Sequence, residues 1–247
     1  MGGLFYNLGR TVGPHIRRAR WIWQSVAGTE ADAIKLENDV GRDLAGQVRH
    51  QLQPDPQSDT EEILNEVGLR LGRCVANRFR TFNFEAVQGP EPNAFALPGG
   101  FIFVTRSLVE LCERQEDEIA FILGHEMGHI VRGHAMQRLI SSSAISAVSR
   151  AVAIHGALSR WLQKVGVQFL ESTYSQQLEF EADRFGAHLA ASAGYEEHAS
   201  LRLLARLEKL SRSPDMLNLG SYFSSHPDYQ VRINNISRIL IKCEQAK

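Results

Sequence analysis

Residues 125–129 of this sequence are His125, Glu126, Met127, Gly128 and His129. On a helix, the two histidines lie one turn apart on one face, so both imidazoles can reach a single ion. Glu126 lies about 100° around the helix from His125. There its carboxylate can accept a proton from an attacking water without occupying a coordination position. The pattern indicates a catalytic zinc site, which needs three protein ligands and an open fourth position.

The residues around this motif predict a helix over 116–137 and narrow the class of zinc site. Metzincins take their third ligand from a histidine at the position of Ala135, with a glycine at the position of Arg132. Gly133 and His134 are each one position out of that frame. We therefore disfavour the metzincin class and expect His134 to be a structural or helix-end histidine.

The acidic run 177–183 is the candidate source of the third ligand. Glu179 and Asp183 are four residues apart and share a helix face, whereas Glu181 points elsewhere. Glu179 would bind the ion. Asp183 would hold the far nitrogen of a ligand histidine and so fix its tautomer. Taken alone, the run is equally compatible with an ordinary acidic helix face.

Hydrophobic periodicity predicts an α+β fold, with helices on either side of a short sheet. We expect a mainly helical zincin-type domain, with a small antiparallel sheet beside the helix that carries the histidines. The domain is expected over 29–247 with its core at 82–240, after a basic arm over 1–28. The expected helices and strands cover 30–53 and 59–77, then strands at 82–87, 93–97 and 101–104, then helices from 105 onward.

The composition excludes several classes of protein. Apolar residues make up 43% and charged residues 22%, as in soluble globular proteins. Acidic and basic residues nearly cancel, at 28 against 27, so no global field favours nucleic acid. The cysteines are Cys74, Cys112 and Cys243, and their wide spacing indicates free thiols rather than disulfides or a cysteine zinc site. No stretch reaches the roughly 18 apolar residues that a membrane span needs.

The first 28 residues carry arginines and tryptophans but no acidic residue. They lack the apolar core of a secretory signal. Three interpretations stay open: an arm docked on the domain, a peripheral contact with an anionic membrane surface, and an organellar leader. The expected location is accordingly cytoplasmic or peripheral to a membrane.

Two further stretches give the sequence a family resemblance. They are Asn93-Ala94-Phe95-Ala96-Leu97-Pro98-Gly99-Gly100, and Ser225-His226-Pro227 followed by Arg232-Ile233. Together with LGHEMGH and LEFEAD, and in this order, they resemble the gluzincin peptidases that include the CAAX prenyl proteases, the HtpX-type membrane proteases and the BepA-type proteases. The resemblance covers about residues 82–236. The prenyl and HtpX branches are multi-span membrane proteins, so the closer analogy is a compact soluble member.

The resemblance implies a set of ligands and a base. One Zn²⁺ per chain would be bound by His125, His129 and Glu179, with Glu126 as the general base. It also implies an edge strand beside the cleft, to which an extended peptide can add by main-chain hydrogen bonds. That strand corresponds to Asn93, Ala94, Phe95, Ala96 and Leu97.

His226 and Arg232 correspond to family residues that reach back to the active site. There, cationic donors can stabilise the oxyanion of the tetrahedral intermediate. Two alternatives stay open. His226 can instead block the fourth zinc position at rest, or it can cap the last helix while Arg232 pairs with a neighbouring carboxylate.

The sequence therefore predicts a zinc-dependent endopeptidase that hydrolyses extended or unfolded protein segments, with a protein or peptide as its partner. The alternative is a zinc-bound but largely latent folding, assembly or quality-control factor, with His226 blocking the site. An aminopeptidase would need a group that binds the substrate amine, and the sequence identifies none.

Overall fold

A computed structural model of the 247-residue chain describes residues 29–141, 174–211, 226 and 228–244. Several expectations therefore lie outside the described residues. They concern the basic arm 1–28, the Ser/Ala-rich helical stretch after residue 141, and positions 225 and 227.

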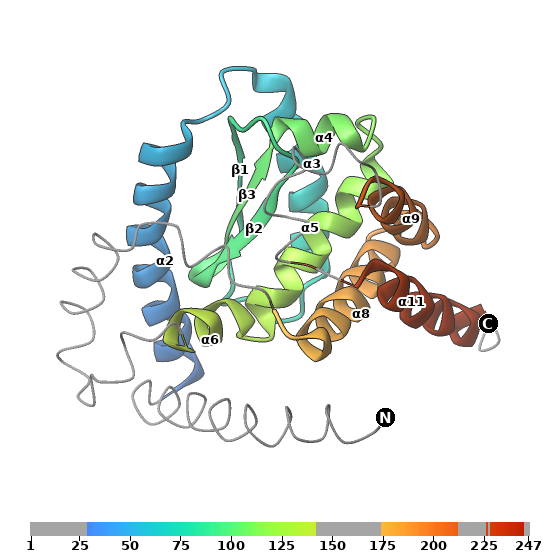
Figure 1. The fold of residues 1–247 in the computed structure, drawn as a ribbon. Coiled ribbons are helices and arrows are strands. Elements are labelled where there is room, and N and C mark those ends of the chain that lie inside the picture. Colours follow the sequence, from blue (N-terminus) through green and yellow to red (C-terminus); the bar gives the residue numbers. More distant parts are fainter. Residues whose placement is uncertain (1–28, 142–173, 212–225, 227, 245–247) are drawn as a thin grey trace.

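The described residues form a mainly helical α+β structure around a three-stranded sheet, which confirms the predicted fold class (Figure 1). The strands are β1 (Asn83–Val87), β2 (Ala94–Leu97) and β3 (Phe101–Thr105). The helices are α2 (Glu30–Leu52), α3 (Ser58–Cys74), α4 (Arg106–Leu111), α5 (Glu116–Val131), α6 (His134–Ser141), α8 (Gln176–Ser192), α9 (Ala199–Ser211) and α11 (Tyr229–Glu244).

The sheet is mixed, so the prediction of an antiparallel sheet was wrong for one of its two pairings. β3 lies in the middle, antiparallel to β2 and parallel to β1. A short 3-10 turn, Pro98–Gly100, joins β2 to β3, and such a short connection requires an antiparallel pair. β1 instead occupies the other edge of β3. Because the chain reverses at 88–93 and again at 98–100, β1 and β3 run in the same direction.

Side chains of the sheet alternate between two apolar layers. Phe95 and Phe103 face each other across β2 and β3, with ring centroids 5.4 Å apart, and pack with residues of α2. Ile102, Val104 and Ala96 point to the opposite layer, with α3 and α5. The sheet therefore separates α2 on one side from α5 on the other, as Figure 1 shows.

Local sequence signals set the helix boundaries, some as predicted and one differently. α2 begins after Thr29 as predicted, and the Thr29 side chain accepts a hydrogen bond from the Asp32 amide. The helix predicted over 116–137 ends at Val131 instead. Gly133 has a φ of 75°, a left-handed conformation that ends α5 and separates it from α6.

Small residues let α5 and α8 approach closely. A side chain at Gly186 would place its Cβ 2.6 Å from the His125 amide nitrogen, and one at Gly124 would lie 3.0 Å from Gly186. One turn further on, a Cβ at Gly128 would lie 3.1 Å from Ala182. The two helices can therefore be adjacent only because these positions lack larger side chains, and this contact aligns their inner faces.

Gly186→Ala should disturb this contact. The added Cβ has no room, so the helices must separate, and we expect the free energy of unfolding to fall by about 1–3 kcal/mol. Gly46→Ala is the matched control, since Gly46 lies within α2 with nothing within 4 Å of the added Cβ. That variant should gain about 0.5–1 kcal/mol. Urea denaturation measures both, and equal shifts would contradict the packing argument.

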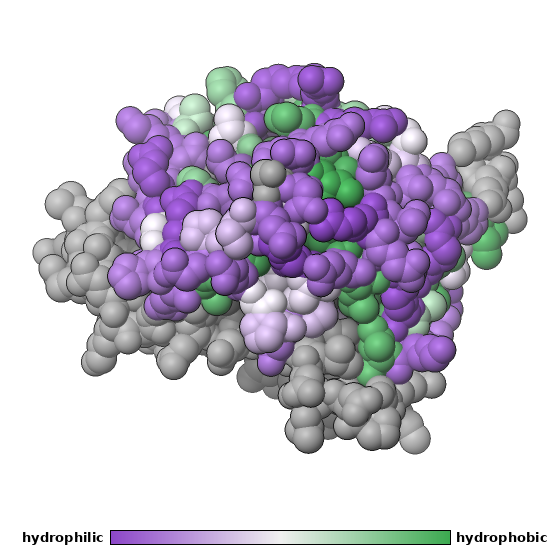
Figure 2. Space-filling model, turned by 90° about the horizontal axis from the view of Figure 1, so that it is seen from above, coloured by the Kyte–Doolittle hydropathy of each residue, from purple (hydrophilic) through white to green (hydrophobic). Residues whose placement is uncertain are grey.

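The exposed apolar side chains are scattered. Hydrophilic residues cover most of the face shown in Figure 2, and its apolar spots are small and separate. Large exposed hydrophobic residues among those described include Leu69, Phe79, Val231 and Ile241. Among the described helices, none combines the length and apolar character that crossing a lipid bilayer requires.

Candidate metal centre

Three segments bring the candidate site residues together at the α5–α8 contact. His125, Glu126 and His129 lie on α5, and Glu179 lies on α8. His226 comes just before α11. Each of these side chains is at most 1% exposed, so the cluster is closed to solvent in this conformation.

Four donor atoms converge at the centre of this cluster. His125 Nε2 lies 3.1 Å from His129 Nε2, and Glu179 Oε1 lies 3.3 Å from His129 Nε2. His226 Nδ1 lies 3.3 Å from His125 Nε2 and 3.0 Å from Glu179 Oε1. One ligand atom from each of these four residues lies within 4.8 Å of all the others.

The donor set fits a zinc ion. Ligands arranged tetrahedrally at about 2.1 Å from zinc are about 3.4 Å apart, close to the separations in this cluster. Two imidazoles and one carboxylate are also ligand types that catalytic zinc sites use. His125, His129 and Glu179 would bind the ion, and His226 Nδ1 has the position of a fourth ligand.

Asp183 and Arg232 form a second layer behind the cluster. Asp183 Oδ1 lies 2.9 Å from His125 Nδ1, which leaves Nε2 of that ring to face the centre. The Arg232 guanidinium is fully buried and donates to both Asp183 oxygens, at 2.8 and 2.6 Å. It also lies 3.3 Å from Glu179 Oε2. Arg232 thus pairs with carboxylates, the alternative left open above, and this contact favours a positioning role over oxyanion binding.

His134 contacts His129, the second proposed ligand histidine. Its Nδ1 lies 3.1 Å from His129 Nδ1, and its Nε2 lies 3.5 Å from the Glu181 carboxylate. Burial lowers the pKa of His134 to about 4, so the ring is neutral at pH 7. It can therefore accept the His129 Nδ1 proton and leave Nε2 of His129 to bind a metal. The sequence named His134 as a structural histidine without identifying this contact.

Electrostatics favour the metal-binding forms of three of the four groups Glu179, Asp183, His129 and His125. The exception is His125, where burial lowers the pKa but Asp183 and Glu179 outweigh it and raise the pKa. Burial opposes the ionisation of Glu179, but the charges of His226 and Arg232 outweigh it and hold its pKa well below the usual range. Burial also opposes the ionisation of Asp183, and Arg232 again reverses the effect, so that the pKa is lowered. Burial brings the pKa of His129 well below its ordinary value. Ionised carboxylates and a neutral imidazole are the forms that bind zinc.

Glu126 is beside the donors but is not one of them. Its Oε1 lies 3.7 Å from His226 Nε2. This oxygen is buried and has no hydrogen-bond partner in the structure. A buried carboxylate oxygen without a donor is costly and calls for a functional explanation. Its position fits a base that acts on a molecule bound at the centre.

The predicted substrate strand, β2, does lie at an edge of the sheet. Its residues Ala94–Leu97 are all buried, the most exposed being Phe95 at 5%. Arg138 Nη2 donates to the carbonyl oxygen of Ala96 at 3.4 Å, so part of the edge is already occupied. Asn93 is fixed next to the strand, since its amide donates to Thr105 Oγ1 at 2.8 Å. Pairing with a peptide therefore requires Arg138 to move.

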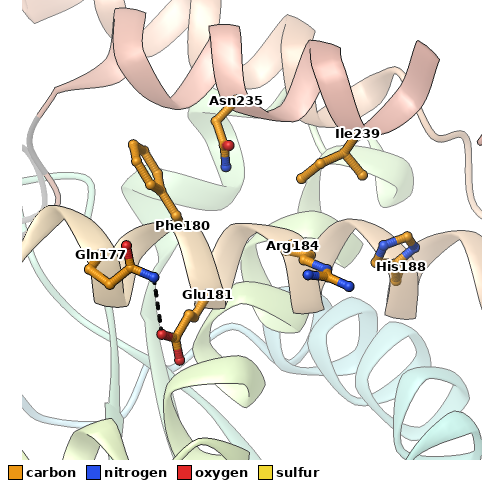
Figure 3. Close-up of a pocket in the computed structure, with 7 residues that line it drawn as sticks. All are labelled: Gln177, Phe180, Glu181, Arg184, His188, Asn235 and Ile239. Atoms are coloured by element: carbon orange, nitrogen blue, oxygen red, sulfur yellow. Dashed lines mark hydrogen bonds between the residues drawn. The ribbon is translucent and has the colours of Figure 1, made fainter. Parts of the chain in front are cut away.

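A separate cavity of about 540 Å³ lies between α8 and α11 (Figure 3). None of the four converging donors lines it, because α8 turns Glu179 and Asp183 toward α5 on its other face. The chemistry of the site therefore does not depend on this cavity. Its lining residues are Gln177, Phe180, Glu181, Arg184, His188, Asn235 and Ile239.

Tyr174 is the site residue that the sequence analysis missed. Its ring stacks on His129, with centroids 3.9 Å apart and planes 16° from parallel. It lies before α8 and outside every spacing rule, so its position depends on tertiary packing alone.

A helix with two histidine donors and a free glutamate, packed against a second helix that supplies a glutamate and an aspartate, defines a gluzincin-type metallopeptidase site. Comparison with known sequences agrees with the class. The chain belongs to peptidase family M48, whose sequence profile matches residues 58–240.

Curated relatives of the chain include bacterial and mitochondrial proteins. The metalloprotease LoiP of Escherichia coli K12 is 31% identical over 184 residues, which are 72% of this chain and 70% of LoiP. Mitochondrial metalloendopeptidase OMA1 of Schizosaccharomyces pombe is 29% identical over 163 residues, 64% of this chain and 47% of that protein. OMA1 of Danio rerio is 32% identical over 166 residues, which are 62% of this chain and 34% of that protein. The chain thus spans less than half of these two OMA1 proteins.

Proposed function

We propose that this protein is a zinc-dependent metalloendopeptidase that cuts extended or unfolded protein segments. The observation that carries the proposal is the convergence of His125, His129 and Glu179 beside a partnerless Glu126 oxygen. Membership of family M48 and the metalloprotease names of the relatives support it.

The site residues would have different roles in hydrolysis. When bound, a zinc ion would polarise the scissile carbonyl and make water easier to deprotonate. Glu126 accepts one proton of the attacking water while the water oxygen bonds to the carbonyl carbon. The same carboxyl then passes this proton to the amide nitrogen as the C–N bond breaks, which yields a new carboxyl group and a free amine. Asp183 and His134 orient the ligand imidazoles throughout.

The resting state is proposed to be latent, because His226 Nδ1 lies among the ligand atoms. A fourth protein ligand closes the position that hydrolysis needs open. The cluster is also shielded from solvent, so a substrate can enter only after His226 withdraws. This observation supports the second candidate function, a latent folding or quality-control factor. An active endopeptidase and a latent factor would differ in how often the site opens.

His226→Ala should therefore increase peptide cleavage. If the open state is a minor population, removing the blocking group raises the rate by about tenfold or more. Zinc content should be unchanged because three ligands remain. His50→Ala, an exposed histidine on α2, is the control and should behave like the wild type. A loss of cleavage with zinc retained would instead place His226 in the chemistry.

Mass spectrometry of casein fragments tests the endopeptidase assignment. Main-chain pairing with β2 would read little side-chain identity, so we expect internal cuts at many unrelated sequences. Stepwise loss of N-terminal residues would indicate an aminopeptidase. The proposed function fails if neither the wild type nor His226→Ala, each loaded with zinc, produces fragments.

A further inference from the structure

Tyr174 forms part of the wall of the metal centre. Besides its stack on His129, its ring centroid lies 5.8 Å from that of His226. The guanidinium carbon of Arg138 lies 4.3 Å from the Tyr174 centroid. The side chain is only 5% exposed. Tyr174 therefore contacts two of the four residues whose donor atoms converge.

Stacking does not explain the hydroxyl group of Tyr174. This oxygen is buried and has no hydrogen-bond partner in the structure. An unpaired buried hydroxyl lowers the stability of the folded state. Phenylalanine would stack on His129 equally well without that cost. The hydroxyl therefore calls for a role in which it gains a partner.

The neighbours of Tyr174 indicate which substrate group its hydroxyl could bind. The Tyr174 ring contacts His129 and His226, which lie among the converging donors. The hydroxyl of this ring and Glu126 Oε1 are both buried and without a hydrogen bond in the structure. A phenol keeps its proton at neutral pH and is a hydrogen-bond donor. A reacting peptide would need a base for its attacking water and a donor for its carbonyl oxygen.

The two donors that the sequence suggested for this oxyanion are otherwise engaged. The Arg232 guanidinium pairs with Asp183 and Glu179. His226 Nδ1 lies 3.0 and 3.1 Å from the two Glu179 oxygens, among the ligand atoms. The Tyr174 hydroxyl is a hydrogen-bond donor that makes no other hydrogen bond in the structure.

We propose that Tyr174 is a catalytic residue whose hydroxyl donates a hydrogen bond to the substrate carbonyl oxygen. The bond strengthens as the carbonyl π electrons move onto that oxygen during attack by water, and it weakens when they return to expel the amine. The phenol keeps its own proton throughout. The inference rests on the proposed peptidase function and adds to it the group that stabilises the oxyanion.

Tyr174→Phe is the direct test, since it removes the oxygen and keeps the stack. We expect kcat to fall about 100-fold or more, with little change in KM or zinc content. Tyr195→Phe is the matched control. Tyr195 is also buried, at 6% exposed, but it belongs to the apolar core instead of the donor cluster. Its loss should leave cleavage unchanged.

A second readout separates an oxyanion donor from a structural residue. A phosphinic peptide mimics the tetrahedral intermediate, so its affinity should fall with Tyr174→Phe by a factor similar to that in kcat/KM. Binding of the uncut peptide to Glu126→Gln should be the same with and without Tyr174→Phe. If Tyr174→Phe cleaves as fast as the wild type, or if it loses zinc, the inference about Tyr174 is wrong while the proposed peptidase function still stands. A zinc-loaded protein that never cleaves overturns the proposed function as well.

Discussion

Glu126→Gln should abolish measurable cleavage of casein while the protein stays folded and keeps its metal. The amide has nearly the shape of the carboxylate but cannot accept a proton from water. Removal of a general base of this kind costs about 10²–10⁴ in rate. Glu126 Oε1 accepts no hydrogen bond in the structure, so the substitution should scarcely change the fold.

Glu181→Gln is the matched control for this variant. Glu181 lies on α8 but, unlike Glu179, it lines the cavity between α8 and α11 instead of the donor cluster. The control should retain at least most of the activity, because Glu181 only supports His134 from a distance of 3.5 Å. Cleavage by Glu126→Gln at a rate near that of the wild type would rule out Glu126 as the base.

Arg232→Met should cause the largest loss of stability of any single change considered. It leaves two buried carboxylates, Asp183 and Glu179, without the cation that pairs with both. Breaking a buried ion pair from one side costs about 3–5 kcal/mol. That is a large share of the roughly 5–15 kcal/mol by which a domain is stable. Urea denaturation with a metal chelator present measures it without interference from bound zinc.

Arg202→Met provides the comparison for a pair of equal length. Arg202 and Glu196 are also 2.6 Å apart, but their side chains are 46% and 52% exposed. Such surface pairs contribute about 1 kcal/mol or less. If the two arginine variants lose the same amount of stability, the buried network does not stabilise the fold as argued.

The parts of the site with local spacing were predictable from the sequence. His125, Glu126 and His129 share one helix turn, and Glu179 and Asp183 share another, so helical geometry alone places each set on one face. Once α5 and α8 are packed together, the two sets meet. The close approach of these helices depends on Gly124 and Gly186, whose importance becomes visible only when the partner helix is known.

Features that depend on distant contacts were not predictable in this way. Strand β1 pairs in parallel with β3, and nothing in residues 82–104 shows which edge it joins. Arg232 was expected near the site, but its choice of carboxylates over an oxyanion depends on where Asp183 lies. Tyr174 follows no motif, and its stack on His129 arises from packing.

Counting zinc in purified protein tests the central claim most directly. After zinc is supplied and excess removed, inductively coupled plasma mass spectrometry should find about one zinc per chain in the wild type and in Glu126→Gln. Glu179→Gln, which loses a ligand, should retain little, with circular dichroism showing that it is still folded. A wild type that binds no zinc, or a Glu179→Gln variant that binds it as tightly as the wild type, would contradict the proposed site.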